Sequence, residues 1–423
     1  MRLRSFWNKL RYVKGADIVS VFRLVAAIPY AIFLRRKRPH IWLICELRME
    51  ARDNGYWIYR YICEQHPLTD AVYAIDLGSP DYSKLASLHG EIIEWGSIKH
   101  WAYYLAAEYN ISSQKSGKPD AAVCYALEVS GIWKNKRIFL QHGVIHNDNE
   151  FLHFRNTRMR LFVCGAKPEY VYVCHHFGYP EGYVKYLGLA RFDGLYNWKS
   201  ERIILVMPTW RKSIANPAVF EKRMDSDDEF IRTRYYKAWQ QFFEDPEFDS
   251  FLKANDLKLL FYPHHDMQRF LHLFHTDSER IMMADWRKCD VQDLLRRSMF
   301  LITDYSSVAM DFAYMYKPLL YYQFDADVFF NHQYKHGYFD YRRDGFGPVC
   351  ETYRDVKREL LKYAGQDFKN DEEYIMKERA FFALHDQNNC ERNYQAIKAL
   401  DNCGIYCTHN SFLYTLTRDR KQP

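Results

Sequence analysis

The chain has 423 residues, of which 48% are apolar, so it is long enough for two domains with a sizeable core. Its net charge of +6 is uneven, because residues 1–40 hold ten Lys or Arg and one acid, a net of +9, which leaves −3 for the remainder. An acidic main body without an RNP, helix-turn-helix or zinc-finger pattern excludes a nucleic-acid-binding protein.

The first predicted element is a basic amphipathic arm, residues 1–40. Its apolar run, residues 18–34, is shorter than the roughly 20 residues of a membrane span and lacks the cleavage site of a secretory signal. Basic clusters on both sides of an aromatic-rich apolar run indicate an interfacial anchor on an anionic membrane. An ordinary first helix packed on the domain is the competing interpretation.

From residue 41 onward, strand-like runs alternate with helical stretches, which predicts parallel sheets with helices on both faces. The strand candidates are Ile41–Cys45, Ala71–Ile75, Glu91–Ile93, Ala121–Cys124, Ile138–Gln141, Leu161–Val163, Ile203–Met207, Lys258–Tyr262, Ile281–Met283, Met299–Thr303 and Leu319–Tyr322. Eleven strands are too many for one tidy sheet and fit two Rossmann-like halves. We expect domains at residues 41–195 and 196–400, followed by a tail at 401–423.

Ligands of such folds bind at the carboxyl ends of the strands, so motifs at strand ends are candidate site residues. In the first half, His142-Gly143 follows a strand, and an imidazole there could take a proton from a hydroxyl. The segment Asp53-Asn54-Gly55 comes after the first strand and could equally be an Asx-type turn.

The second half carries three motifs of the same kind. Asp304-Tyr305-Ser306-Ser307 joins a strand to a helix, and its free backbone N–H groups and hydroxyls predict an anion site, although helix capping would explain it too. Thr209-Trp210-Arg211 adds a guanidinium that matches phosphate oxygens. His264 follows another strand; the neighbouring histidine points elsewhere, so phosphate binding is favoured over metal chelation.

Together these motifs resemble the CDP-glycerol glycerophosphotransferase family of teichoic acid and capsule enzymes. The resemblance covers roughly residues 40–395 and is densest from Val291 to Thr352. It includes Lys317-Pro318, Tyr338-Phe339-Asp340 and Phe346-Gly347-Pro348 in order. The sequence differs from the family pattern at Val144–Asn147 and at His264-His265. Both differences lie near the implied acceptor and donor positions, so the resemblance does not fix the acceptor or the exact polyol.

The resemblance implies a GT-B-like fold, with an N-terminal acceptor domain and a C-terminal CDP-polyol donor domain that face a central cleft. It implies transfer of glycerol phosphate, or another polyol phosphate, to an acceptor hydroxyl, with release of CMP and without a metal or cofactor. His142 matches the general base and His264 a second catalytic residue. The implied substrate-binding residues are Gly143, Asn54, Thr209, Trp210, Arg211, Asp304, Ser306 and Ser307.

The implied partners are a CDP-polyol, a polymer or lipid-linked acceptor and an anionic membrane, which places the protein at the cytoplasmic face of the cell membrane. Two alternatives share the fold: a GT-B glycosyltransferase using a nucleotide sugar, and a non-catalytic scaffold. The absence of GxGxxG and Walker A motifs argues against dinucleotide binding and a P-loop NTPase. The ten cysteines are scattered, which fits the cytosol, and Cys403, Cys407 and His409 are too loosely spaced for a zinc site.

Overall fold

The computed structural model describes residues 15–130, 136–196, 199–215, 224, 226–333 and 335–400. The chain divides into two compact units, each built on a parallel sheet. Of the described residues, unit 1 draws on those within 15–142, 150–193 and 386–400, and unit 2 on those within 143–149 and 194–385. The tail at 401–423, including Cys403, Cys407 and His409, lies outside the described residues, as do residues 1–14 of the arm.

Unit 1 has a seven-stranded sheet in the order β3-β2-β1-β4-β5-β6-β7, with every pairing parallel. Its strands are β1 (Trp42–Cys45), β2 (Ala71–Ile75), β3 (Glu91–Glu94), β4 (Tyr109–Ser112), β5 (Arg137–Phe139), β6 (Leu161–Cys164) and β7 (Val184–Tyr186). Its helices are α2 (Gly15–Lys37), α3 (Asn54–Gln65), α4 (Tyr82–Ala86), α5 (Ile98–Ala106), α6 (Ala121–Ser130), η1 (Glu150–Leu152), α7 (Phe154–Thr157), α8 (Lys167–His176) and α17 (Asn389–Lys398), with η2 (Ala190–Gly194) at its boundary.

Unit 2 has a six-stranded sheet in the order β10-β9-β8-β11-β12-β13, also parallel throughout. Its strands are β8 (Glu201–Met207), β9 (Lys258–Phe261), β10 (Ile281–Met283), β11 (Ser298–Thr303), β12 (Leu319–Tyr322) and β13 (Val349–Cys350). Its helices are α9 (Asp227–Ile231), α10 (Arg234–Glu244), α11 (Pro246–Ala254), η3 (His265–Leu273), α12 (Val291–Arg297), α13 (Val308–Tyr314), α14 (Ala326–His332), α15 (Tyr353–Gly365) and α16 (Glu372–Phe381).

The strands of unit 1 bury both faces, so neighbouring residues of one strand enter different cores. In β1, Trp42 and Ile44 join the core that contains residues of α3 and α17, whereas Leu43 and Cys45 join the core that contains residues of α2 and α5. This alternation follows from the two-residue period of a strand. A strand covered on both sides reads as a continuous apolar run, which is why Ile41–Cys45 is recognisable in the sequence.

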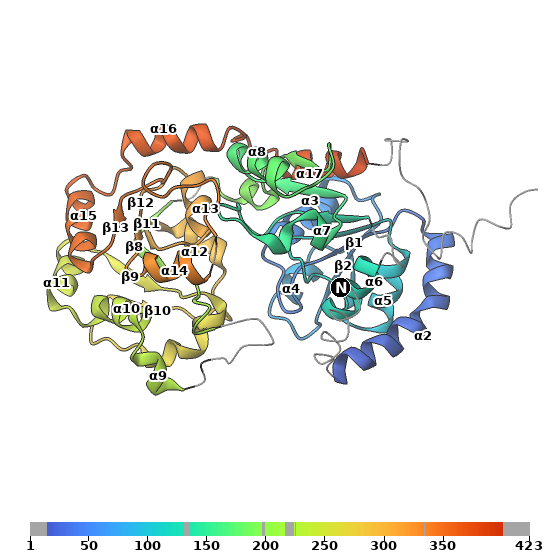
Figure 1. Cartoon of the computed structure of the whole chain (residues 1–423), viewed down its shortest axis with the longest axis horizontal. Coiled ribbons are helices and arrows are strands. Elements are labelled where there is room, and N and C mark those ends of the chain that lie inside the picture. Colours follow the sequence, from blue (N-terminus) through green and yellow to red (C-terminus); the bar gives the residue numbers. More distant parts are fainter. Residues whose placement is uncertain are drawn as a thin grey trace, which may run out of the picture. The chain divides into compact units, whose positions relative to one another are not determined.

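Helix α17 returns the chain to unit 1, whereas the sequence predicts that residues up to 400 belong to the second domain. The carboxylate of Asp193 accepts hydrogen bonds from the backbone N–H groups of Asn389 (3.0 Å) and Cys390 (2.7 Å), and this caps the start of the helix. The ring of Tyr394 then lies 5.5 Å from that of Trp42. Figure 1 shows α17 beside α3.

Ten of the eleven predicted strands are present, and one prediction is wrong. Residues 121–124 begin helix α6, because the carboxylate of Asp120 accepts hydrogen bonds from the N–H groups of Ala122 and Val123, both at 2.9 Å. Strand β4 was missed because it contains Asn110 and Ser112, whose polar side chains are buried in hydrogen bonds. Strands β7 and β13 have three and two residues and carry little signal.

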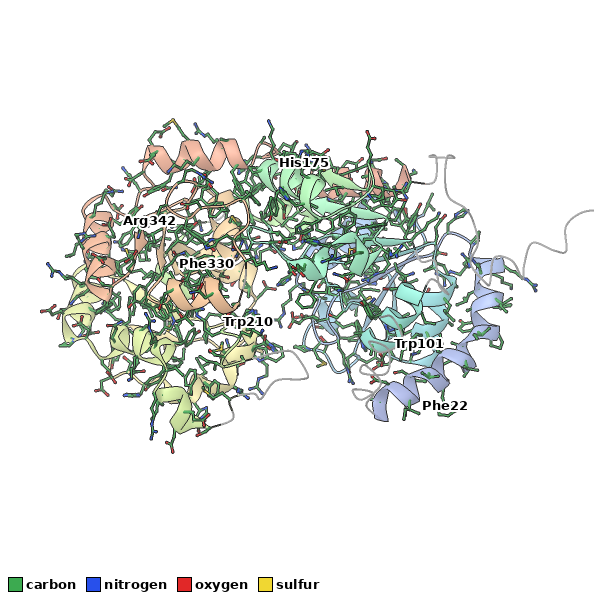
Figure 2. The ribbon with its side chains drawn as sticks, in the orientation of Figure 1. Phe22, Trp101, His175, Trp210, Phe330 and Arg342 are labelled. Carbon is green, nitrogen blue, oxygen red and sulfur yellow. The ribbon has the colours of Figure 1, made fainter. Side chains whose placement is uncertain are left out.

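Helix α2 packs on α5 through one side only. Ala27 and Ala31 are fully buried there, and Leu34 is nearly so. Phe22 on α2 is 72% exposed, whereas Trp101 on α5 is buried (Figure 2). Helix α2 has 23 residues, and an 18-residue stretch within it has a mean hydropathy of 1.8, so it has the length and composition to cross a membrane.

Candidate active site

Both sheets have the strand order of a doubly wound fold, which identifies one switch point in each unit. The order reverses between β1 and β4 in unit 1 and between β8 and β11 in unit 2. Connections on either side of such a point leave in opposite directions, so a binding site forms at the carboxyl ends of those strands. Most of the predicted site residues follow one of these four strands or a strand that neighbours them in the sheet.

In unit 1, His142 stands on a turn held in an unusual conformation. Gln141, which follows β5, has a φ of +70°, a region that residues other than glycine rarely occupy. The side chain of Gln141 donates to Glu169 (2.5 Å), and its carbonyl accepts from the Asn54 amide (2.7 Å). These bonds fix the turn, and the His142 side chain beyond it is 65% exposed.

The His142 ring is oriented by a carboxylate. Its Nδ1 lies 2.6 Å from Asp53 Oδ2, and Gln114 also touches Nδ1 at 2.6 Å. Because an ionised carboxylate can only accept, Nδ1 carries the proton and its N–H donates to Asp53; the Gln114 amide then bonds Nδ1–H only through its oxygen. The other ring nitrogen, Nε2, is then the unprotonated one and can take a proton from a substrate.

Asp53 is itself held by Arg191 from the segment before unit 2. The Arg191 guanidinium donates to Asp53 Oδ1 (2.6 Å) and to the His142 carbonyl (2.5 Å). The backbone N–H of Arg191 donates to the Asn54 side chain (2.9 Å). Asn54 is fully buried between the turn and Arg191, so it positions the cluster instead of touching a substrate.

A second buried carboxylate, Glu46 at the end of β1, shapes the loop that carries Asp53. It accepts hydrogen bonds from the backbone N–H groups of Arg52 (3.0 Å), Asp53 (3.1 Å) and Tyr56 (2.8 Å). Burial and the charge of Asp53 raise the pKa of Glu46 to about 7, although these hydrogen bonds oppose the rise. Glu46 thus ties the start of α3 to the sheet.

The charges in this cluster set the protonation of its members. Burial acts to raise the pKa of Asp53, but the positive charges of Arg191 and His142 outweigh it and keep that pKa below its ordinary value. Desolvation acts to lower the pKa of His142, but the Asp53 charge and hydrogen bond raise it above its ordinary value. Asp53 therefore remains ionised and makes His142 a stronger base.

Residues 143–149 follow His142 and belong to unit 2. Gly143 is their first residue, partly exposed. His146 is buried, and its Nε2 lies 3.1 Å from the Tyr305 carbonyl, between the rings of Phe339 and Tyr341. Burial lowers the pKa of His146, so it is a neutral hydrogen-bond donor in this part of the unit 2 site.

At the unit 2 switch point, Asp304 follows β11 and connects the end of this strand to the end of β8. Its Oδ1 accepts the backbone N–H of Thr209, which follows β8 (2.8 Å), and that of Tyr305 (2.6 Å). Asp304 is fully buried, and these two bonds join the ends of the two strands. The Thr209 hydroxyl is buried and has no hydrogen-bond partner among the described residues.

Ser306 and Ser307 are partly exposed at the turn that follows. The Ser306 hydroxyl accepts a long 3.4 Å bond from Val308 N–H, whereas the Ser307 side chain makes no cap bond. Neither serine N–H donates to another residue of the described chain. The turn therefore presents donors that suit an anion.

His264 lies at the end of β9, the strand next to β8. Its backbone N–H donates to the Pro208 carbonyl (3.3 Å), which holds it against the strand end that carries Thr209. Its Nδ1 accepts from the N–H of Asp266 (3.3 Å), and 38% of the side chain is exposed. The Trp210 ring lies 6.5 Å from the imidazole. The predicted residues of this half thus gather at one sheet edge.

Arg211 has a different environment from the one predicted for it. Its guanidinium is buried and bonds Asp304 (2.8 Å), both oxygens of Asp325 (2.7 and 3.0 Å) and the Thr209 carbonyl (2.8 Å). Burial acts to lower its pKa, but the two carboxylates raise it further, so the charge is permanent. Four of its five N–H groups are already hydrogen-bonded within the protein, which argues against direct phosphate binding by Arg211 and favours a role in which it supports the site from behind.

Four of the residues that build these sites are absent from the predicted set: Glu46, Asp53, Gln114 and Arg191. In the sequence, Asp53 stands out only as part of a turn, and Arg191 lies only a few residues before the predicted domain boundary at 195/196. In the described ranges, no three His, Cys, Asp or Glu side chains come together in a metal-binding arrangement.

Comparison with known proteins identifies the family of this chain. The sequence profile described as CDP-Glycerol:Poly(glycerophosphate) glycerophosphotransferase matches residues 188–399, half of the chain. The chain belongs to this family. The resemblance drawn from the motifs is confirmed.

The curated relatives carry teichoic acid names, and two of them illustrate the match. The minor teichoic acid biosynthesis protein GgaB of Bacillus subtilis is 30% identical over 90% of this chain and 42% of its own length. The teichoic acid poly(glycerol phosphate) polymerase of Bacillus spizizenii is 27% identical over 41% of this chain and 39% of its own length. The chain therefore spans about two fifths of the length of these two relatives.

Among solved structures, the wall teichoic acid polymerase TagF is similar in fold. It superposes with a TM-score of 0.62 over 95% of this chain and 98% of that chain, at 16% identity. The predicted GT-B-like fold with two Rossmann-like domains is confirmed.

Proposed function

We propose that this chain transfers glycerol phosphate, or another polyol phosphate, from a CDP-linked donor to an acceptor hydroxyl, and releases CMP. The observation that carries the proposal is the His142–Asp53 pair in a member of this family. Relatives named as teichoic acid enzymes support the polymer class, and one solved structure is that of a TagF variant after a soak with CDPG.

In the proposed reaction, His142 Nε2 removes the proton of the acceptor hydroxyl as its oxygen attacks the phosphorus that bears the polyol. The new P–O bond forms as the bond from that phosphorus to the CMP oxygen breaks, and CMP leaves with the electron pair. Asp53 stays ionised and stabilises the imidazolium. A histidine whose pKa is raised by a carboxylate is well matched to this role.

The donor phosphates need charge stabilisation, since phosphoryl transfer depends mainly on positioning and electrostatics. We assign this role to the Thr209 hydroxyl, the Ser306 and Ser307 turn and His264, with Trp210 beside them. The unpartnered Thr209 hydroxyl and the uncommitted serine N–H groups support the assignment. Arg211 and Asp304 hold these groups in place.

We further propose that the protein works at the cytoplasmic face of the cell membrane, bound through α2. The side of α2 opposite α5 exposes apolar residues, among them Phe22, Val25 and Phe33, and its last turn carries Arg35–Lys37. An apolar face followed by basic residues suits an interface with anionic lipids. The packing of Ala27 and Ala31 on α5 favours a helix that lies on the membrane over one that crosses it.

A donor screen tests the reaction. The purified protein is incubated with CDP-glycerol, CDP-ribitol and nucleotide sugars, each with a polyol-phosphate acceptor, and nucleotide release is measured. We expect CMP from a CDP-polyol alone. Nucleotide release from a nucleotide sugar but from neither CDP-polyol would instead support a glycosyltransferase.

A further inference from the structure

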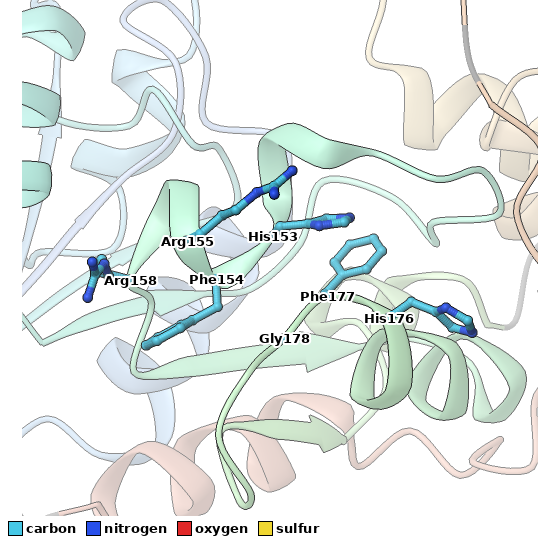
Figure 3. Close-up of a pocket in the computed structure, with 7 residues that line it drawn as sticks. All are labelled: His153, Phe154, Arg155, Arg158, His176, Phe177 and Gly178. Carbon is cyan, nitrogen blue, oxygen red and sulfur yellow. The ribbon is translucent and has the colours of Figure 1, made fainter. Parts of the chain in front are cut away.

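A pocket of about 390 Å³ lies in unit 1, lined by residues outside the His142 cluster. One wall is the segment around α7, with His153, Phe154, Arg155 and Arg158, and the other is the end of α8 with residues 176–178 (Figure 3). Its volume is in the range of about 300–1,000 Å³ that is usual for small-molecule sites. Nothing in the proposed reaction uses it.

The lining is basic. It contains two arginines and two histidines and no acidic residue. Arg155 has an acidic neighbour, Glu150, at 3.6 Å, with 69% and 51% of the two side chains exposed. An exposed pair at this distance contributes little, so Arg155 can exchange Glu150 for a ligand anion at small cost.

The framework beneath these side chains is fixed. The N–H of Phe154 donates to the Phe177 carbonyl (2.9 Å), which ties the two walls together. The rings of His153 and Phe177 pack with centroids 4.6 Å apart, side by side in Figure 3. The Tyr179 hydroxyl donates to the Leu152 carbonyl (2.9 Å). A pocket held this way loses little freedom when a ligand binds.

The same segment is connected to the catalytic cluster within unit 1. Lys115 donates to the Phe151 carbonyl (2.8 Å), two residues before His153, and its ammonium lies 5.7 Å from the centre of the Phe151 ring. Its chain neighbour Gln114 touches His142. A series of contacts through Gln114 and Lys115 thus links the cluster to the segment that forms one wall of the pocket.

We propose that this pocket binds a phosphate of an anionic polyol-phosphate polymer, the acceptor, at a unit remote from the hydroxyl that reacts. The inference rests on the proposed function for the identity of the polymer. A polymer with one phosphate in each unit is held through several cationic contacts, and Arg155, Arg158 and Lys115 supply them. The pocket then selects acceptors that already carry several units.

Binding of a fluorescent poly(glycerol phosphate) oligomer to the full chain tests this directly and needs no catalysis. Arg155→Gln with Arg158→Gln is compared with Arg60→Gln and Arg358→Gln, two exposed arginines that pair with acids of their own helices. We expect the pocket pair to weaken binding roughly 5- to 30-fold, with a shallower salt dependence, and the control pair to change it less than twofold. Thermal unfolding verifies that both are folded.

A second arm separates this inference from the proposed function. If the wild type releases CMP with a one-unit acceptor, the pocket variant should do so at the wild-type rate but show a raised KM for the oligomer. Oligomer binding that is unchanged in the pocket variant, or absent in the wild type, overturns the inference. Absence of CMP release with intact, pocket-dependent oligomer binding would refute the reaction and leave the pocket standing.

Discussion

Asp53 and His142 are 89 residues apart in sequence, yet their side chains meet at 2.6 Å at the carboxyl end of one sheet. Asp53 stands after β1 and His142 after β5, and Arg191 contacts both. The carboxylate does two things to the imidazole: it fixes the proton on Nδ1, and it raises the pKa of the ring. Each effect can be measured.

Asp53→Asn should lower kcat by roughly 10²- to 10⁴-fold, because the ring loses its fixed tautomer and the negative charge that stabilises its protonated form. The low-pH limb of the rate profile should also move to lower pH. A base works unprotonated, Asp53 raises the pKa of His142, and removal of that charge lowers it. Asp76→Asn, just after β2, is the matched control. It should leave both kcat and the low-pH limb of the rate profile unchanged. A profile of Asp53→Asn that coincides with the wild type would contradict the pairing.

Arg211→Met should destabilise unit 2 by about 3–5 kcal/mol, because it leaves the buried carboxylates of Asp304 and Asp325 without their cation. Chemical denaturation at neutral pH measures the loss. Adding Asp304→Asn and Asp325→Asn to this variant should recover part of it. A stable Arg211→Met protein with only a raised KM for the donor would return Arg211 to direct phosphate binding.

Thr209→Val should raise the donor KM roughly tenfold without lowering the unfolding temperature, because the hydroxyl has no partner to lose among the described residues. Thr303→Val is the contrast. Its hydroxyl donates to the Met207 carbonyl (2.7 Å), so that change should cost about 1 kcal/mol of stability and leave the donor KM unaltered. Equal effects of the two substitutions on KM would remove Thr209 from the donor site.

Phe22→Ser with Phe33→Ser should release the protein from liposomes that contain anionic lipid, because these rings stand on the exposed side of α2. Leu361→Ser with Met376→Ser removes comparably exposed apolar side chains from α15 and α16, and should not alter sedimentation with the liposomes. Retention of the α2 variant on the vesicles would refute the membrane role of this face.

The sequence was informative wherever a local rule decides the structure. Continuous apolar runs such as Ile203–Met207 predict buried parallel strands, and serines and glycines after them mark the turns. The sequence did not predict features that depend on contacts between residues far apart in the chain. The role of Arg211 depends on Asp304 and Asp325, 93 and 114 residues away, and no local pattern shows that its charge is already neutralised. The Asp53–His142–Arg191 cluster is likewise a product of the sheet order.

CMP release from a CDP-polyol by wild type and by His142→Gln tests the proposed general base most directly, with His66→Gln, a partly exposed histidine after α3, as the control. We predict that His142→Gln lowers the rate by roughly 10²- to 10⁴-fold at an unchanged unfolding temperature, whereas His66→Gln retains the wild-type rate. Wild-type CMP release by His142→Gln would show that His142 is not the base and would contradict the proposed mechanism.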